Sequence, residues 1–150
     1  MSVTVGLKGQ AETVVNDTNT AQAACSGALP VFGTPFLCAL MEEAAWKSIA
    51  PHLEEGQSTV GTRLEVSHDS ATPVGMKVWA ESEVTEVDGK RLVLKVAAYD
   101  EKGLIKASRS LNSGARMDSF LYALKNFISL FILIPLRIDN ILTGYFSLQL

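Results

Sequence analysis

Two carboxylates and a histidine are the side chains of this sequence best suited to acid–base chemistry near neutral pH. Glu42 and Glu43 are adjacent in a segment with helical spacing, and His68 ends a run of alternating residues. The residues three and four positions from Glu42 are small or apolar: Cys38, Ala39, Ala45 and Trp46. A carboxylate on such a flank is destabilised in its charged form, which makes Glu42 the candidate for chemistry. The alternative is a helix-edge carboxylate that reaches water or a backbone donor.

The other titratable residues have simpler interpretations. Glu43 has Lys47 four positions later, the favourable order for an ion pair on a solvated helix face, so we expect it at the surface. His68 is in phase with the apolar residues of its strand, which predicts that it points toward the core side. The alternative for His68 is a satisfied structural histidine. His52 falls in a predicted turn and is assigned no role.

A third candidate, Thr34, precedes a helix predicted over residues 36–50. Thr34 suits the N-cap and Pro35 the first helical position, so the threonine hydroxyl also has a structural interpretation. Thr34 and Glu42 are eight residues apart, about 12 Å along a continuous helix. If both residues serve one site, the simplest arrangement takes them from opposite protomers of a dimer.

The elements that must position these residues form a simple series. Residues 3–15 are expected to be extended, and the helix is expected to end near Ala50, because Pro51 disfavours helical geometry there. Four strands then follow, over residues 59–68, 76–87, 91–99 and 104–111. Asp88 and Gly89 are predicted to form the hairpin turn between the second and third of them. One helix followed by a meander of four strands is an α+β layout. A single helix leaves one sheet face and the edges uncovered, so we expect a homodimer.

The composition sets outer limits on function. The chain has 150 residues, 47% of them apolar and 19% charged, with a net charge of -3, which fits one packed domain and excludes a disordered chain. The sequence contains no cluster of lysine and arginine of the kind that binds nucleic acids. Cys25 and Cys38 lack disulfide-framework and zinc-ligand spacing, and free thiols together with the absence of a signal-like N-terminus predict a cytoplasmic protein. The sequence contains no P-loop, nucleophile-elbow or zinc-protease motif, and we expect no metal or cofactor.

The final segment, residues 119–150, is distinct in composition. It contains three charged residues, Lys125, Arg137 and Asp139, so a domain boundary is predicted near residue 118. We expect an apolar, helical tail that docks on the domain or on a partner. The uncharged stretch at 126–136 is about half the length needed to cross a bilayer, so a spanning helix is disfavoured, although membrane contact remains an alternative.

Three stretches of the chain resemble the hotdog-fold thioesterases related to fluoroacetyl-CoA thioesterase. They are residues 26–35, 39–45 and 66–75. The patterns T-P-x5-M-E-x-A-A and V-x-H-x3-T-P-x-G occur at the family's spacing, and the similarity covers roughly residues 3–116. The resemblance implies that residues 1–118 form a hotdog fold, a central helix wrapped by an antiparallel sheet, and that two protomers associate side by side with acyl-CoA bound between them. Higher oligomers remain open.

The resemblance also implies an activity and a set of site residues. The family uses a threonine, a glutamate and a histidine, which correspond here to Thr34, Glu42 and His68, and it places a glycine, here Gly61, against the substrate thioester. The implied reaction is hydrolysis of a small or medium acyl-CoA to a carboxylic acid and CoA. Glu42 would act as general base or as nucleophile, and the sequence leaves this choice open.

Two alternative functions remain at the level of sequence. The first is a hotdog protein that binds acyl-CoA without cleaving it, against which the presence of all three polar positions argues. The second is a hotdog hydratase or dehydratase, which would also pair an acid with a histidine. The loop-borne aspartate and histidine pattern expected for that activity is absent.

Overall fold

The computed structural model describes residues 3–116, with backbone alone for 106–116, as one helix and five strands. The helix α1 spans Thr34–Ile49, and Ala50–His52 continue it as a short 3-10 turn. The strands are β1 Lys8–Val14, β2 Gln57–Glu65, β3 Lys77–Asp88, β4 Arg91–Asp100 and β5 Gly103–Arg116. The predicted α+β class is therefore confirmed, and the helix ends where Pro51 predicts. The predicted tail at 119–150 lies outside the described residues.

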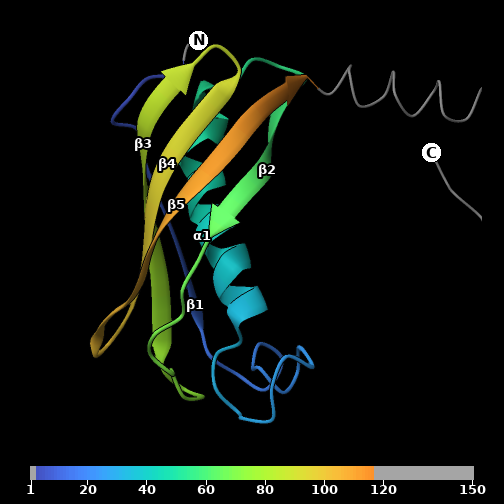
Figure 1. Cartoon of the computed structure of the whole chain (residues 1–150), viewed down its shortest axis with the longest axis vertical. Helices are drawn as coiled ribbons and strands as arrows, with labels where there is room; N and C mark the ends of the chain where they lie inside the picture. Colours follow the sequence, from blue (N-terminus) through green and yellow to red (C-terminus); the bar gives the residue numbers. More distant parts are fainter. Residues whose placement is uncertain (1–2, 117–150) are drawn as a thin grey trace, which may run out of the picture. The chain divides into compact units, whose positions relative to one another are not determined.

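The helix packs lengthwise against one face of the sheet (Figure 1). Its buried residues recur at helical spacing and join inward residues of β3 and β4 in a single apolar core: Leu37, Leu40, Met41, Ala44, Ala45 and Ile49. Gly9 of β1 permits the close approach, because a Cβ there would overlap the backbone of Ala44 and Ser48. Ser82 of β3 also donates a hydrogen bond of 2.7 Å from its Oγ to the Ala44 carbonyl. The position of α1 on the sheet is thus fixed by steric fit and by a buried polar contact.

The order of the strands corrects one prediction. The sheet is antiparallel with the order β1-β3-β4-β5-β2, so only β3, β4 and β5 form a meander. The predicted meander of four strands is wrong, because β2 pairs with β5 at one edge and β1 pairs with β3 at the other. A long connection, residues 66–76, separates β2 from β3, and a tight hairpin between them is therefore not formed. β1 and β2 are the two edges of this sheet.

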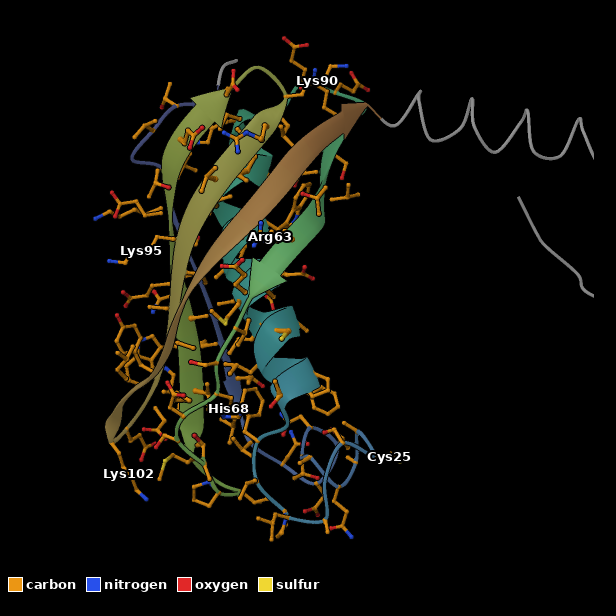
Figure 2. All side chains as sticks on the ribbon, viewed as in Figure 1. Cys25, Arg63, His68, Lys90, Lys95 and Lys102 are labelled. Carbon is orange, nitrogen blue, oxygen red and sulfur yellow. The ribbon has the colours of Figure 1, made fainter. Side chains whose placement is uncertain are left out.

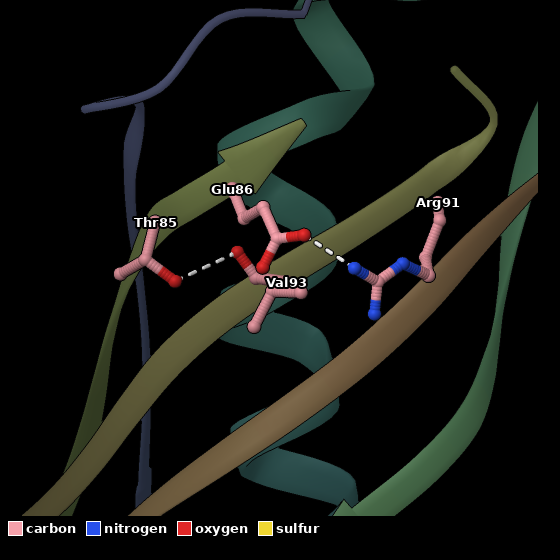
Figure 3. Close-up of polar contacts among 4 residues, drawn as sticks. All are labelled: Thr85, Glu86, Arg91 and Val93. Atoms are coloured by element: carbon pink, nitrogen blue, oxygen red, sulfur yellow. Dashed lines mark hydrogen bonds and ion pairs between the residues drawn. The ribbon is translucent and has the colours of Figure 1, made fainter. Parts of the chain in front are cut away.

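The hairpin of β3 and β4 follows the sequence prediction closely. Its two-residue turn is Gly89 and Lys90, one residue later than predicted, because Asp88 still belongs to β3 and pairs with Arg91. Gly89 has a φ of 56°, the left-handed conformation that such a turn requires. A bulge falls at Thr85, whose Oγ1 donates to the Val93 carbonyl at 3.1 Å, while Glu86 pairs with Arg91 across the strands (Figure 3). The side-chain bond satisfies a carbonyl beside the irregular register, so the long hairpin continues through the bulge.

Among the described residues, no helix is long and apolar enough to cross a membrane. The predicted membrane contact concerns residues 119–150, which lie outside the described residues, so it stays a prediction.

Candidate active site

The first turn of α1 presents Thr34 differently from the sequence expectation. The N-cap is Gly33, in extended geometry, and Thr34 is the first helical residue with Pro35 next to it. The predicted N-cap role of Thr34 is therefore wrong, and no side-chain capping bond is made at this end. Gly33 is buried against the backbone of Thr20, where an added Cβ would be tight, so a glycine suits this position. The threonine hydroxyl is consequently available for another contact.

His68 lies beyond its predicted strand. β2 ends at Glu65, so His68 belongs to the connection at 66–76, which we call the His68 segment. The predicted strand phase fails only before the register shift between Gly61 and Arg63, where Val60 is 54% exposed. After the shift it holds, since His68 is partly buried and Val66 packs against the core. Figure 2 shows His68 on this segment, beside the first turn of α1. The edge strand β2 thus ends three residues before His68, and the histidine lies in a loop.

The structure brings two of the candidate residues together within one protomer. Thr34 Oγ1 and His68 Nδ1 are 3.0 Å apart, a hydrogen bond whose direction depends on the tautomer of the ring. Both residues line a groove of about 620 Å³, together with Pro35, Cys38 and neighbouring loop residues. A hydroxyl and an imidazole at this distance on a groove can hold a carbonyl group or pass a proton to one.

The electrostatics favour a neutral imidazole. Burial lowers the pKa of His68 below its ordinary value of 6.5, against the opposing influences of the Ser70 backbone and the Asp69 charge. At pH 7 the ring therefore has one donor and one acceptor nitrogen. Nδ1 meets Thr34, while the buried Nε2 makes no hydrogen bond to any other described residue.

Glu42 lies on the same helix, two turns after Thr34. Its neighbours are small or apolar, as the spacing predicts, but the side chain is exposed in a single protomer, so its own chain does not supply the expected apolar cover. Cys38 stands between the two on the helix surface, half buried. Burial and then the charge of Glu42 raise the pKa of the Cys38 thiol. Glu43 forms the predicted surface ion pair with Lys47, at 2.7 Å.

Two observations revise the lining of the site. Gly61 is exposed on β2, next to the bulge, and it is not among the described residues that line the groove with Thr34 and His68. Cys38 does line that groove, although the sequence analysis treated it only as a neighbour of Glu42. Its position four residues after Thr34 is the signal that could have identified it, because such pairs share a helix face.

The architecture, a single helix against a five-stranded antiparallel sheet, defines a hotdog-fold protein. A hot-dog-like protein from Thermanaerovibrio acidaminovorans has the same fold, with a TM-score of 0.74 over 82% of this chain and 91% of that one, at 22% identity. The sequence profile of the fluoroacetyl-CoA-specific thioesterases matches residues 15–110. The chain belongs to this family.

Relatives of known structure or annotation extend the comparison. Fluoroacetyl-CoA thioesterase from Streptantibioticus cattleyicolor is 43% identical over 70 residues, 47% of this chain and 50% of that protein, so the match spans about half of the curated relative. The crystal structure of a point mutant of a fluoroacetyl-CoA-specific thioesterase aligns with a TM-score of 0.77 and 28% identity, over 85% of this chain and 98% of that one. A thioesterase superfamily member from Thermus thermophilus aligns with a TM-score of 0.79 and 26% identity, over 87% and 97%.

Proposed function

We propose that this protein hydrolyses acyl-CoA thioesters with small or medium acyl groups, releasing a carboxylic acid and CoA. The observation that carries the proposal is the contact between Thr34 and His68 on a groove, about two helical turns from Glu42. Family membership supports the same reaction class, and one relative of known structure was crystallised with fluoroacetate and CoA. The chemistry requires only side chains and water, so the proposal includes no metal or cofactor.

The three side chains divide the work of hydrolysis. In the general-base route, Glu42 takes a proton from water as the water oxygen bonds to the thioester carbon. The C–S bond then breaks, and the proton passes through His68 or Glu42 to the CoA sulfur. Thr34 holds either the substrate carbonyl or the His68 ring by hydrogen bonding. Gly61 does not line the groove of its own chain, so a backbone N–H near it would face the developing oxyanion from a second protomer.

A covalent route uses the same residues. Here a Glu42 carboxylate oxygen bonds to the thioester carbon, the C–S bond breaks, and the CoA thiolate takes a proton from solvent. Water then hydrolyses the anhydride, which releases the carboxylic acid and regenerates the Glu42 carboxylate. Single turnover in ¹⁸O-labelled water separates the two routes, because only hydrolysis of the anhydride at the Glu42 carboxyl carbon can leave label in that residue.

We propose a homodimer as the active form, with a second copy covering the exposed face of α1. Glu42 is exposed on that face, Trp46 is 40% exposed, and Val60 of the edge strand β2 is 54% exposed. Exposed large apolar side chains and an unpaired sheet edge are typical of surfaces that are buried by association. Thr34 and Glu42 are about 12 Å apart on one helix, so a partner's Glu42 can face a Thr34–His68 pair.

A cytoplasmic location remains a prediction, which two free cysteines support.

The decisive experiment is thiol release from a panel of acyl-CoA substrates of increasing chain length. We expect turnover with short and medium acyl groups, and a loss of about 100-fold or more in kcat for Glu42→Gln and for His68→Gln, the size typical of a lost acid–base group. Glu43→Gln is the matched control, because Glu43 pairs with Lys47 at the surface, and its kcat should stay within about two-fold. Tight binding of CoA without turnover of any thioester would instead establish an acyl-CoA binding protein.

A further inference from the structure

Thr72 connects three parts of the fold that meet beside the candidate site. It is fully buried within the His68 segment, four residues after His68. Its Oγ1 donates a hydrogen bond of 2.8 Å to Oδ2 of Asp100, and its carbonyl accepts one of 2.8 Å from the N–H of Phe32. Phe32 lies two residues before Thr34. Thr72 therefore ties the segment that carries His68 to the segment that leads into α1.

Asp100 anchors this connection to the sheet. It is the last residue of β4 and is 3% exposed, which is unusual for an aspartate. Both carboxylate oxygens accept a hydrogen bond, Oδ2 from Thr72 and Oδ1 from the N–H of Lys102 at 2.8 Å. Hydrogen bonds to a carboxylate are stronger than those between neutral groups, and a buried acceptor left without its donor is costly. The end of β4 is thus a fixed point for the His68 segment.

The two segments that Thr72 joins make further contacts with each other. Val31 and Pro73 form an antiparallel bridge next to the bond between Phe32 and Thr72. The contact between Thr34 and His68, at 3.0 Å, is the next one along the same pair of segments. Because both segments are irregular, their separation is set by these contacts and not by sheet or helix geometry.

We propose that Asp100 and Thr72 are positioning residues that hold His68 against Thr34. The expected effect on turnover rests on the proposed function, whereas the expected effect on the position of His68 does not. Neither residue touches the groove, so each acts through the His68 segment. Losing the hydroxyl of Thr72 would free the segment from the sheet and lengthen the contact between the catalytic pair.

The test compares Thr72→Val, which keeps the shape of the side chain but removes the hydroxyl, with Thr72→Ser, which keeps the hydroxyl. NMR titration of the two histidine rings, assigned with His52→Gln, reports the surroundings of His68 without any need for activity. We expect His68 to titrate below pH 6.5 in the wild type and in Thr72→Ser. In Thr72→Val its midpoint should move upward toward 6.5, because a displaced ring is better solvated.

Kinetics provide the second readout, since a misplacement of about 1 Å can cost up to about 100-fold in rate. For Thr72→Val we expect kcat to fall roughly 10-fold to 100-fold with KM within about two-fold, and Thr72→Ser should restore it. Asp100→Asn, which loses one of the two acceptors, should move both readouts in the same direction and replaces Thr72→Val if that variant does not fold. Thr85→Val makes the same exchange at the bulge of β3 and β4, where the lost hydroxyl bonds the Val93 carbonyl away from both α1 and the His68 segment, and serves as the matched control.

The outcomes are distinct. A folded Thr72→Val protein with an unchanged His68 titration overturns the proposal, as does an equal loss of kcat in Thr72→Val and Thr85→Val. If no acyl-CoA is hydrolysed by the wild type, the proposed function fails, while a shifted His68 midpoint in Thr72→Val would still support the positioning role.

Discussion

The Thr34 hydroxyl and the His68 ring share one hydrogen bond, and the environment of the ring decides its chemical form. Burial outweighs the neighbouring Asp69 charge and the Ser70 backbone, so the pKa of the imidazole lies below its ordinary value. A neutral ring can accept a proton from one group while donating to another, which an imidazolium cannot do. The site is therefore suited to proton transfer at neutral pH without a fixed positive charge beside the thioester.

The lowered pKa of His68 makes a prediction about stability. The unfolded chain binds a proton at this histidine near pH 6.5, whereas the folded protein binds it only at lower pH. Stability contributed by the neutral ring is therefore present above pH 6.5 and is lost as the pH falls below that value. Thermal unfolding followed from pH 8 to pH 5 should show a steeper loss of Tm in the wild type than in His68→Gln.

His52→Gln is the control for that experiment, because His52 lies in the 3-10 turn after α1 and has no part in the site. Its unfolding profile should follow that of the wild type. Parallel profiles for the wild type and His68→Gln would show that His68 contributes nothing to the acid dependence.

The sequence predicts the contacts of some candidate residues and not those of others. Glu43 and Lys47 form the predicted surface pair, since helical spacing alone determines such contacts. The contact between Thr34 and His68 could not be predicted from spacing, because they are 34 residues apart and His68 lies in a loop. The predicted N-cap role for Thr34 was wrong for a related reason: a buried glycine, whose tight surroundings are visible only in three dimensions, takes that position.

At the scale of elements, local patterns predicted strands better than they predicted pairing. The hairpin at Gly89 and the alternation of β3 were correct, because turn chemistry and strand faces are local properties. The placement of β2 beside β5 depends on the route of the residues at 66–76, which carry no turn signal that fixes a partner. The same connection delivers His68 to α1, so the topological error and the misplaced histidine have one cause.

The contact between α1 and β1 depends on a glycine, which makes it testable. In Gly9→Ala the added Cβ would overlap backbone atoms of Ala44 and Ser48, which cannot move without shifting the helix. We expect a loss of about 1–3 kcal/mol in the free energy of unfolding, the range for overpacked cores, measured by urea denaturation. Activity should fall as well, since α1 carries Thr34 and Glu42.

Gly27→Ala is the matched control for this variant. A Cβ at Gly27 would make only an ordinary contact with the Ala21 side chain, at 3.5 Å, so its stability should remain within about 0.5 kcal/mol of the wild type. Equal stabilities for Gly9→Ala and Gly27→Ala would mean that the helix does not need the glycine for its approach to the sheet.

At the scale of the whole molecule, the groove lies at the start of α1 and the Glu42 carboxylate lies near the middle of that helix. Thr34 and His68 meet at the first turn of α1, and Glu42 is exposed two turns later. A second copy related by two-fold symmetry would bring the Glu42 of one protomer to the Thr34–His68 pair of the other, and the reverse. Each of the two sites would then combine residues from both chains.

This arrangement predicts that two inactive variants complement each other. When Glu42→Gln and His68→Gln chains are co-expressed with different affinity tags and the mixed dimer is purified through both, one of its two sites holds only wild-type residues. Its thiol-release activity should therefore be about half that of the wild-type dimer, since the other site carries both substitutions. A dimer of two differently tagged Glu42→Gln chains has no intact site and should remain inactive. Sites contained within single chains would leave the mixed dimer as inactive as that control, because each of its chains would then carry one damaged site.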